Sequence, residues 1–159
     1  MLTAEAVISR YGLVPHPEGG WYREIHRSGH ALGLLPGYPG ERVASTVIYY
    51  LLAEGDVSVF HQVRSEEFWV HLAGAPLELV ILDAEPVSKV LSPLGGDGAP
   101  VLAVPREALQ AARSLGEWTL AACLVAPGFE FADFTLPGRQ ELLQAFPRHG
   151  ELIRRFTRR

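Results

Sequence analysis

Hydrophobic and polar positions alternate along most of this chain with a period of two residues. That period is typical of strands that bury one face and expose the other. Glycine, proline and short polar turns interrupt the pattern at frequent intervals, as they do between the strands of sandwiches and barrels. The alternation and its breaks predict strands at 21–28, 43–52, 57–63, 67–72, 77–82, 101–104, 118–126 and 129–136.

Two longer interruptions separate the predicted strands. Residues 29–40 hold four glycines and two prolines, and we expect them to form a loop. Residues 86–100 are also broken by glycine and proline, and we expect a loop or an irregular hairpin there.

The period changes to that of a helix only near the two ends. Residues 2–11 are predicted to form a short helix, with Thr3 as its N-cap and Gly12 as its stop. Residues 139–156 have helical spacing interrupted by Pro147. Because no long helices alternate with the strands, the pattern predicts an all-β sandwich or barrel. With neither a linker nor a repeat, we expect residues 1–159 to form a single domain.

Composition and charge narrow the classes of function. The chain has 159 residues and a net charge of −4, so it offers no electrostatic footprint for nucleic acid. It has no apolar run of about 18 residues for a membrane span. The only cysteine, Cys123, lies in an apolar run and is predicted to be a small buried hydrophobe. With no disulfide framework and no signal peptide, we expect a cytoplasmic protein.

One spacing carries candidate chemistry. Gly55 and Gly74 frame two predicted strands joined by a tight turn, with His61 on the first strand and Glu67 on the second. If the first strand turns its His61 face into a barrel, the imidazole and the carboxylate converge there. Such a pair suits a metal ion or acid–base catalysis.

The same residues resemble the first conserved motif of the cupins, Gly-x5-His-x-His-x3-Glu-x6-Gly. This chain has His61 and Glu67 at two metal-ligand positions, but Val63 replaces the second histidine. Gln110 replaces the histidine of the second motif, which here runs from Pro105 to Gln110. Both replacements are poor ligands for a transition metal, so we expect no cofactor, with a divalent metal at His61 and Glu67 as the alternative.

The resemblance extends to the cupin subfamily first described as a domain of unknown function, DUF985 or Cupin_5. Its blocks occur in order at 16–24, 45–52, 60–69 and 125–134. The resemblance implies a cupin double-stranded β-helix, or jelly-roll, barrel over about 16–136, with short N- and C-terminal helices. It also implies a homodimer and a pocket similar to that of the metal-free deoxy-sugar nucleotide epimerases.

Further residues are candidates for the pocket. Tyr50, or its neighbour Tyr49, could present a hydroxyl as a catalytic acid, because alternation lets only one of the two face inward. Trp69 could stack on a ligand or pack in the core, and Gln110 could bind a ligand or be a strand-edge amide.

Two charged residues also have two possible roles each. An inward Arg23 would suit a phosphate or carboxylate on the ligand, and an outward one would suit pairing between subunits. Asp133 could orient His61 as its acid partner, or it could cap the turn at Gly128.

Three functions follow from these observations. The first is a metal-independent epimerase or isomerase acting on a polar small molecule such as a sugar nucleotide, with His61 as base and a tyrosine as acid. The second is a metal-dependent dioxygenase or isomerase that uses His61 and Glu67. The third is a binding module without catalysis.

Overall fold

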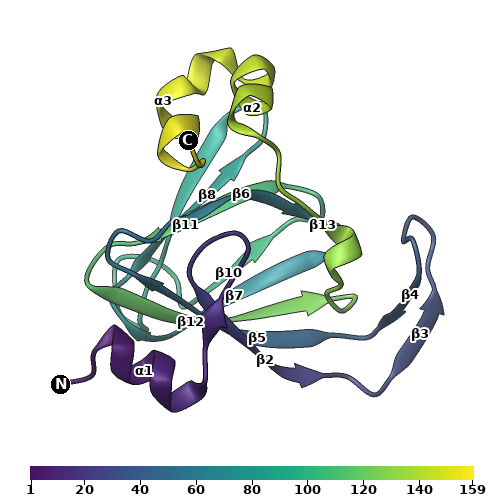
Figure 1. Cartoon of the computed structure of the whole chain (residues 1–159), viewed down its shortest axis with the longest axis horizontal. Coiled ribbons are helices and arrows are strands. Elements are labelled where there is room, and N and C mark those ends of the chain that lie inside the picture. Colours follow the sequence, from purple (N-terminus) through teal and green to yellow (C-terminus); the bar gives the residue numbers. More distant parts are fainter.

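Two antiparallel sheets face each other and enclose the main core (Figure 1). The computed structural model describes residues 1–159. The six-stranded sheet has the order β1 (Val14–Pro15), β2 (Trp21–Arg27), β5 (Thr46–Ala53), β12 (Trp118–Ala126), β7 (Glu66–Gly74) and β10 (Val101–Val104). The five-stranded sheet has the order β13 (Phe134–Thr135), β6 (Ser58–Val63), β11 (Leu109–Ser114), β8 (Leu77–Leu82) and β9 (Pro86–Leu91). The all-β class predicted from the alternation is confirmed.

The core between the sheets is built from the inward positions of the alternating strands. Tyr50, Trp69 and Cys123 extend inward from β5, β7 and β12, and Leu79 meets them from β8. All four are at most 2% exposed. Burial of so many large apolar side chains is the main force that holds the two sheets together.

A short N-terminal helix covers one end of the larger sheet. α1 spans Ala4–Tyr11, and the Thr3 hydroxyl accepts a hydrogen bond from the backbone N–H of Ala6 at 3.2 Å. Gly12 ends the helix in the left-handed conformation, with φ +63°. The predicted cap and stop are therefore both confirmed. Val7 packs with Leu51 on the outer side of the sheet.

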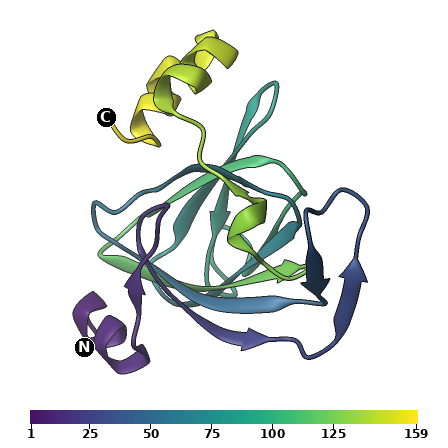
Figure 2. The ribbon, with the colours of Figure 1, turned by 45° about the vertical axis from the view of Figure 1, so that its right-hand side comes forward.

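The C-terminal helices close the outer side of the smaller sheet (Figures 1 and 2). α2 (Arg139–Ala145) and α3 (Gly150–Arg155) lie on either side of η2 (Pro147–His149), which is one turn of 3-10 helix. The predicted proline break falls in η2. Ile153 and Phe156 pack on Phe60 of β6 and Ala111 of β11. None of the helices is long and apolar enough to cross a membrane.

The structure differs from the sequence-based expectations at three segments, 29–40, 109–114 and 129–136. Residues 29–40 are not all loop, because Ala31–Leu34 (β3) and Glu41–Val43 (β4) pair as a two-stranded arm that extends away from the barrel (Figure 2). Of the glycines and prolines, only Pro36, Gly37, Pro39 and Gly40 lie in the tip of this exposed hairpin, between its two strands. Residues 109–114 form β11, which the alternation does not predict. β11 is buried on both faces from Leu109 to Ala112, so it lacks a polar face.

The segment 86–100 combines both predicted alternatives, with β9 at its start and an irregular stretch behind it. Within 129–136 only Phe134–Thr135 are extended, because the 3-10 turn η1 (Phe131–Asp133) replaces most of the predicted strand.

The loop between β1 and β2 positions the functional site. It crosses the space between the sheets, where it is drawn in purple in Figure 1. The backbone N–H of Val59 on β6 donates to the carbonyl of Glu18 at 2.9 Å. Gly19 adopts φ +108°, and a Cβ there would lie 2.1 Å from the carbonyl oxygen of Val57. Only glycine allows this close approach, so the loop is fixed against β6.

Candidate functional site

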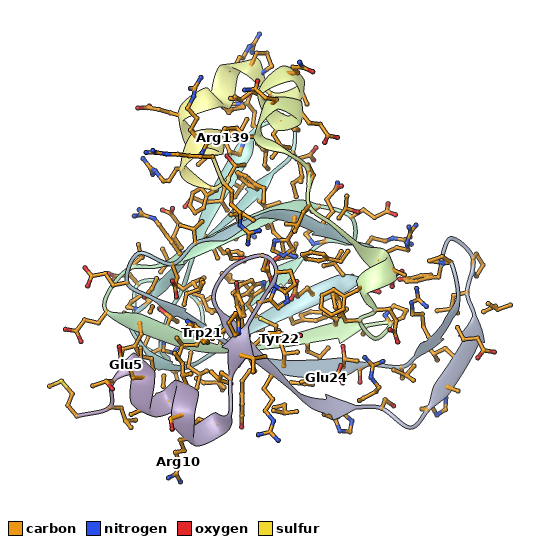
Figure 3. All side chains as sticks on the ribbon, viewed as in Figure 1. Glu5, Arg10, Trp21, Tyr22, Glu24 and Arg139 are labelled. Atoms are coloured by element: carbon orange, nitrogen blue, oxygen red, sulfur yellow. The ribbon has the colours of Figure 1, made fainter.

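A cavity of about 230 Å³ lies between the two sheets. Figure 3 shows the crowded side chains between the sheets and labels Tyr22 and Glu24, two of the residues that line the cavity. Its buried end is formed by His61, Glu67 and Cys123. Aromatic rings form its walls, and its exposed end carries charged side chains. The wall and exposed-end residues used below are Tyr22, Phe129, Phe131, Phe134, Glu24, Arg27 and Glu130.

His61 faces a carboxylate that comes from a distant part of the chain. Its Nδ1 lies 2.7 Å from Oε2 of Glu18 and 2.8 Å from the carbonyl oxygen of Val59. The hydroxyl of Ser58 donates to the same Glu18 oxygen at 2.7 Å. Because two oxygen acceptors surround Nδ1, that nitrogen carries a hydrogen. Nε2 has no protein partner and is the atom of His61 free to meet a ligand.

The contact between Glu18 and His61 is an ion pair at neutral pH. Burial alone lowers the pKa of His61, but the charge and hydrogen bonding of Glu18 outweigh it and raise the pKa to about 9. Burial alone raises the pKa of Glu18, yet His61 and the Ser58 hydroxyl reverse that effect and leave the pKa lowered. The two directions agree, so the buried end of the cavity holds an imidazolium next to a carboxylate.

A second histidine, His16, stays neutral beside this pair. Its Nδ1 accepts a hydrogen bond from the backbone N–H of Glu18 at 3.1 Å. Burial lowers its pKa, and the opposing charge of Glu18 does not compensate. The ring packs edge-to-face on Tyr22 with the centroids 4.5 Å apart. His16 therefore lines the cavity as a neutral imidazole whose Nδ1 is an acceptor.

Glu67 is held by a chain of buried side chains. Nε2 of Gln110 donates to Oε1 of Glu67 at 2.7 Å, and Nε1 of Trp69 donates to Oε1 of Gln110 at 3.0 Å. Burial, followed by the negative charge of Glu18, raises the pKa of Glu67 to about 7 although His61 acts in the opposite direction. Glu67 therefore titrates closer to neutral pH than an ordinary glutamate. Of the predicted ligand-binding residues, Trp69 and Gln110 orient this carboxyl group.

Two further predicted residues, Tyr50 and Arg23, do not line the cavity. The hydroxyl of Tyr50 donates to the carbonyl of Gly19, and burial raises its pKa well above the ordinary value. Arg23 is exposed and donates to the carbonyl of Tyr11 at the end of α1, at 3.2 Å. Tyr50 thus fastens the loop that carries Glu18, and Arg23 lies beside α1.

Asp133 binds an arginine instead of His61. Its two carboxylate oxygens accept from Nη2 and Nε of Arg42 at 2.6 and 2.8 Å, and both side chains are buried. Arg42 lies on β4 and Asp133 in η1, so the pair fixes the base of the β3–β4 arm to the barrel. The carboxylate partner of His61 is Glu18, and not Asp133 as the sequence suggested.

The side chains at the expected metal position do not form a metal site. Val63 offers no donor atom, and both ends of the Gln110 amide are engaged by Trp69 and Glu67. No group of three or more His, Cys, Asp or Glu side chains has the arrangement to hold a metal ion. The donor set therefore does not fit the cupin metal centre.

Sequence reasoning assigned no catalytic role to His16, Glu18 or Ser58. The signal was present, because His16 and Glu18 stand in the first block of the family resemblance. Strand alternation cannot say where an irregular loop lies, and it therefore cannot pair a loop carboxylate with a histidine on a later strand.

Comparisons with known proteins agree with this fold. The family described as Cupin superfamily (DUF985) matches residues 5–137. A hypothetical protein from Leishmania major is 28% identical, with a TM-score of 0.91 over 99% of this chain and 100% of its own. A protein from Shewanella oneidensis is 31% identical, with a TM-score of 0.90 over 99% of each chain.

More distant structures show the fold alone. A cupin 2 domain-containing protein from Halorhodospira halophila is 14% identical, with a TM-score of 0.59 over 92% of this chain and 88% of its own. No curated protein matches the chain. The predicted cupin barrel with short terminal helices is thus confirmed.

Proposed function

We propose that this chain, a member of the Cupin_5 (DUF985) family of the cupin superfamily, is an acid–base enzyme that moves a proton on a small polar molecule without a metal ion. The supporting observation is the pairing of two different titratable groups on one enclosed cavity. His61 is held as a cation by Glu18, and Glu67 titrates with a pKa of about 7. Burial brings the pKa of Glu67 close to neutrality, and the Glu18 carboxylate keeps His61 protonated there, so one group can accept a proton while the other donates a hydrogen bond.

The geometry changes the roles that the sequence suggested. We expected His61 to act as the base and Tyr50 as the acid. With a pKa near neutrality, Glu67 is the better base, since a general base works best when its pKa lies near the working pH. His61 presents Nε2–H to the cavity and is the better donor.

These roles suit abstraction of a proton from a carbon next to a carbonyl group. Glu67 takes the proton as the C–H bond breaks, and the electron pair moves onto the carbonyl oxygen. His61 stabilises the resulting oxyanion with Nε2–H. If the first carbon carries a hydroxyl group, the oxyanion takes a proton from Nε2 of His61 and the hydroxyl returns one to it, and return of the abstracted proton to the neighbouring carbon then gives isomerisation. Epimerisation needs a proton delivered by water to the opposite face of the first carbon, while Glu67 gives its proton to the solvent. Each route ends with the protein in its starting protonation state.

The size of the cavity limits the substrate. A volume of about 230 Å³ is below the roughly 300–1,000 Å³ typical of drug-sized ligand sites. It suits a molecule of monosaccharide size. For a sugar nucleotide, only the sugar would enter, and the nucleotide would lie beyond the exposed end.

Two other functions remain as alternatives. A binding module without catalysis is favoured by the aromatic walls, which would hold a ligand without any proton transfer. A metal-dependent enzyme would need a ligand set that these side chains do not form. Metal analysis by mass spectrometry of the wild type and of His61→Ala tests that alternative. A stoichiometric ion that is lost in the variant would favour it.

Hydrogen–deuterium exchange tests the proton transfer directly. The protein is incubated in D₂O with keto sugars, both free and nucleotide-linked, and the C–H signals next to the carbonyl are followed by proton NMR. We expect exchange with at least one compound and a loss of roughly 100-fold or more in Glu67→Gln.

Glu66→Gln is the matched control, because Glu66 is the exposed neighbour on the same strand. Equal exchange in Glu67→Gln and Glu66→Gln would remove Glu67 from the mechanism. Saturable binding without exchange would favour the binding module.

A further inference from the structure

Every positive charge at the cavity is already neutralised by the protein. At the exposed end, Arg27 lies 2.8 Å from Glu24 and 3.0 Å from Glu130, and it also donates to the carbonyl of Phe129 at 3.1 Å. At the buried end, His61 lies 2.7 Å from Glu18. A phosphate or carboxylate on a ligand would have to displace one of these carboxylates to find a cation. Nothing in the cavity offers the free arginine or lysine that anion sites use.

The carboxyl groups that line the cavity, in contrast, outnumber its cations. Four carboxyl side chains line the cavity, Glu18, Glu24, Glu67 and Glu130, against two cations. Glu67 is 7% exposed and forms no ion pair, since its only protein partner is the neutral amide of Gln110 at 2.7 Å. A buried carboxylate is costly without a cationic partner. The partner that the protein does not provide can come from a ligand.

The walls of the cavity also favour a cation with an apolar body. The rings of Phe129, Phe131 and Phe134 pack edge-to-face, with centroids 5.0 to 6.0 Å apart, and Tyr22 extends the aromatic surface. Aromatic faces attract ammonium groups, and the attraction is stronger in a desolvated site. The imidazolium of His61 does not oppose this strongly, because Glu18 neutralises it.

We propose that the cavity binds a small, ring-sized organic ammonium compound, such as an amino sugar, with its positively charged nitrogen on the aromatic walls near the negative charge of Glu67, and that it discriminates against anionic ligands. This inference rests on the same cavity as the proposed function and names the substrate class. The nucleotide diphosphate of a sugar nucleotide finds no free cation there.

Three probes of one shape and different charge test the inference. Cyclohexylamine, cyclohexanol and cyclohexanecarboxylate are titrated into the wild type at about pH 8, where the amine is protonated and the acid ionised. A chelator keeps the buffer free of metal ions, and binding is followed by saturable NMR shifts. We expect the amine to bind roughly tenfold more tightly than the alcohol, and the carboxylate to bind most weakly. Glu67→Gln should bring the amine to within about twofold of the alcohol, and Glu66→Gln should leave the order unchanged.

The order of the three probes in the wild type needs no variant, so it remains informative if Glu67→Gln does not fold. A carboxylate that binds as well as the amine would overturn the inference, and so would an amine without saturable shifts in the millimolar range. The deuterium-exchange experiment is independent of this order. Selective amine binding without any exchange would keep the ligand class and remove the catalytic proposal.

Discussion

Oε2 of Glu18 lies 2.7 Å from Nδ1 of His61, and the two residues come from different parts of the fold. Glu18 is carried by the glycine-rich loop before β2, and His61 by β6 in the opposite sheet. The contact therefore exists only when the loop is fastened across the barrel. Tyr50 and Val59 fasten it through hydrogen bonds to the backbone of Gly19 and Glu18.

Removal of the Glu18 charge should reduce the loss of stability that the wild type shows as the pH rises into the alkaline range. The folded pKa of His61 is raised from 6.5 to about 9, so its contribution is complete below 6.5 and is lost as the pH rises through about 9. Glu18→Gln leaves His61 buried without a carboxylate, and this loss in stability should disappear.

Denaturant unfolding between pH 6.5 and about 9 measures the effect. Near neutrality the variant should be less stable by roughly 3–5 kcal/mol, as expected for a broken buried ion pair. A decline with pH as steep as in the wild type would contradict the pairing.

Glu67 should act on stability in the opposite sense to an ion-paired carboxylate such as Glu18, whose pKa is lowered in the folded state. Burial raises its folded pKa from 4.5 to about 7, so the folded state holds the proton more tightly and stability falls as the pH rises between these values. The difference amounts to on the order of 3 kcal/mol. Glu67→Gln should lose this part of the pH dependence.

Unfolding free energies of the wild type, Glu67→Gln and Glu66→Gln at both ends of this range provide the test. If Glu67→Gln and the wild type fall in parallel, Glu67 has an ordinary pKa and is not a poised base.

Asp133→Asn should destabilise the fold without changing the charge of His61. Asp133 forms a buried two-point contact with Arg42, and the variant leaves an uncompensated guanidinium. We expect a loss of roughly 3–5 kcal/mol in the unfolding free energy, measured with denaturant. The pKa of His61, followed by NMR, should stay where it is in the wild type. A clear fall of that pKa would restore Asp133 as the acid partner of His61.

The outer face of the six-stranded sheet should be the contact surface of the expected homodimer. Val47, Phe68 and Leu124 form one row of facing residues across β5, β7 and β12, and Tyr49, Val70 and Ala122 form the next. All six are apolar or aromatic and only half-buried. A continuous apolar face of this kind suits a self-complementary contact.

Light scattering at micromolar concentration should therefore give a dimer for the wild type and a monomer for Leu124→Arg. Leu94→Arg is the control, because Leu94 is 89% exposed and lies outside this face. A monomeric wild type would contradict the prediction.

The alternation in the sequence was sufficient to predict most of the strands and the all-β class of the fold. β8 and β12 begin and end where the pattern predicts, because each is a strongly apolar run with clear turn residues on both sides. The alternation does not predict β11, because this strand is buried on both faces and has no polar face. The alternation does not predict the β3–β4 arm either, because an exposed hairpin needs no hydrophobic face.

The candidate site could be predicted only in part. The motif spacing identified His61 and Glu67, and both line the cavity. Their roles depend on neighbours that no local pattern reveals. Glu18 reaches His61 across the barrel, and Gln110 and Trp69 hold Glu67 through side-chain hydrogen bonds. A pKa is a property of such surroundings, so the acid and base roles emerged only from the folded structure.

An NMR titration of His61 and Glu67 in the wild type, with signals assigned through His61→Ala and Glu67→Gln, tests the proposed acid and base roles most directly. We expect His61 to stay protonated through neutral pH and to titrate at about 9, and Glu67 to titrate at about 7. A neutral His61 at pH 7 beside a Glu67 that is fully ionised there would contradict the proposed acid and base roles.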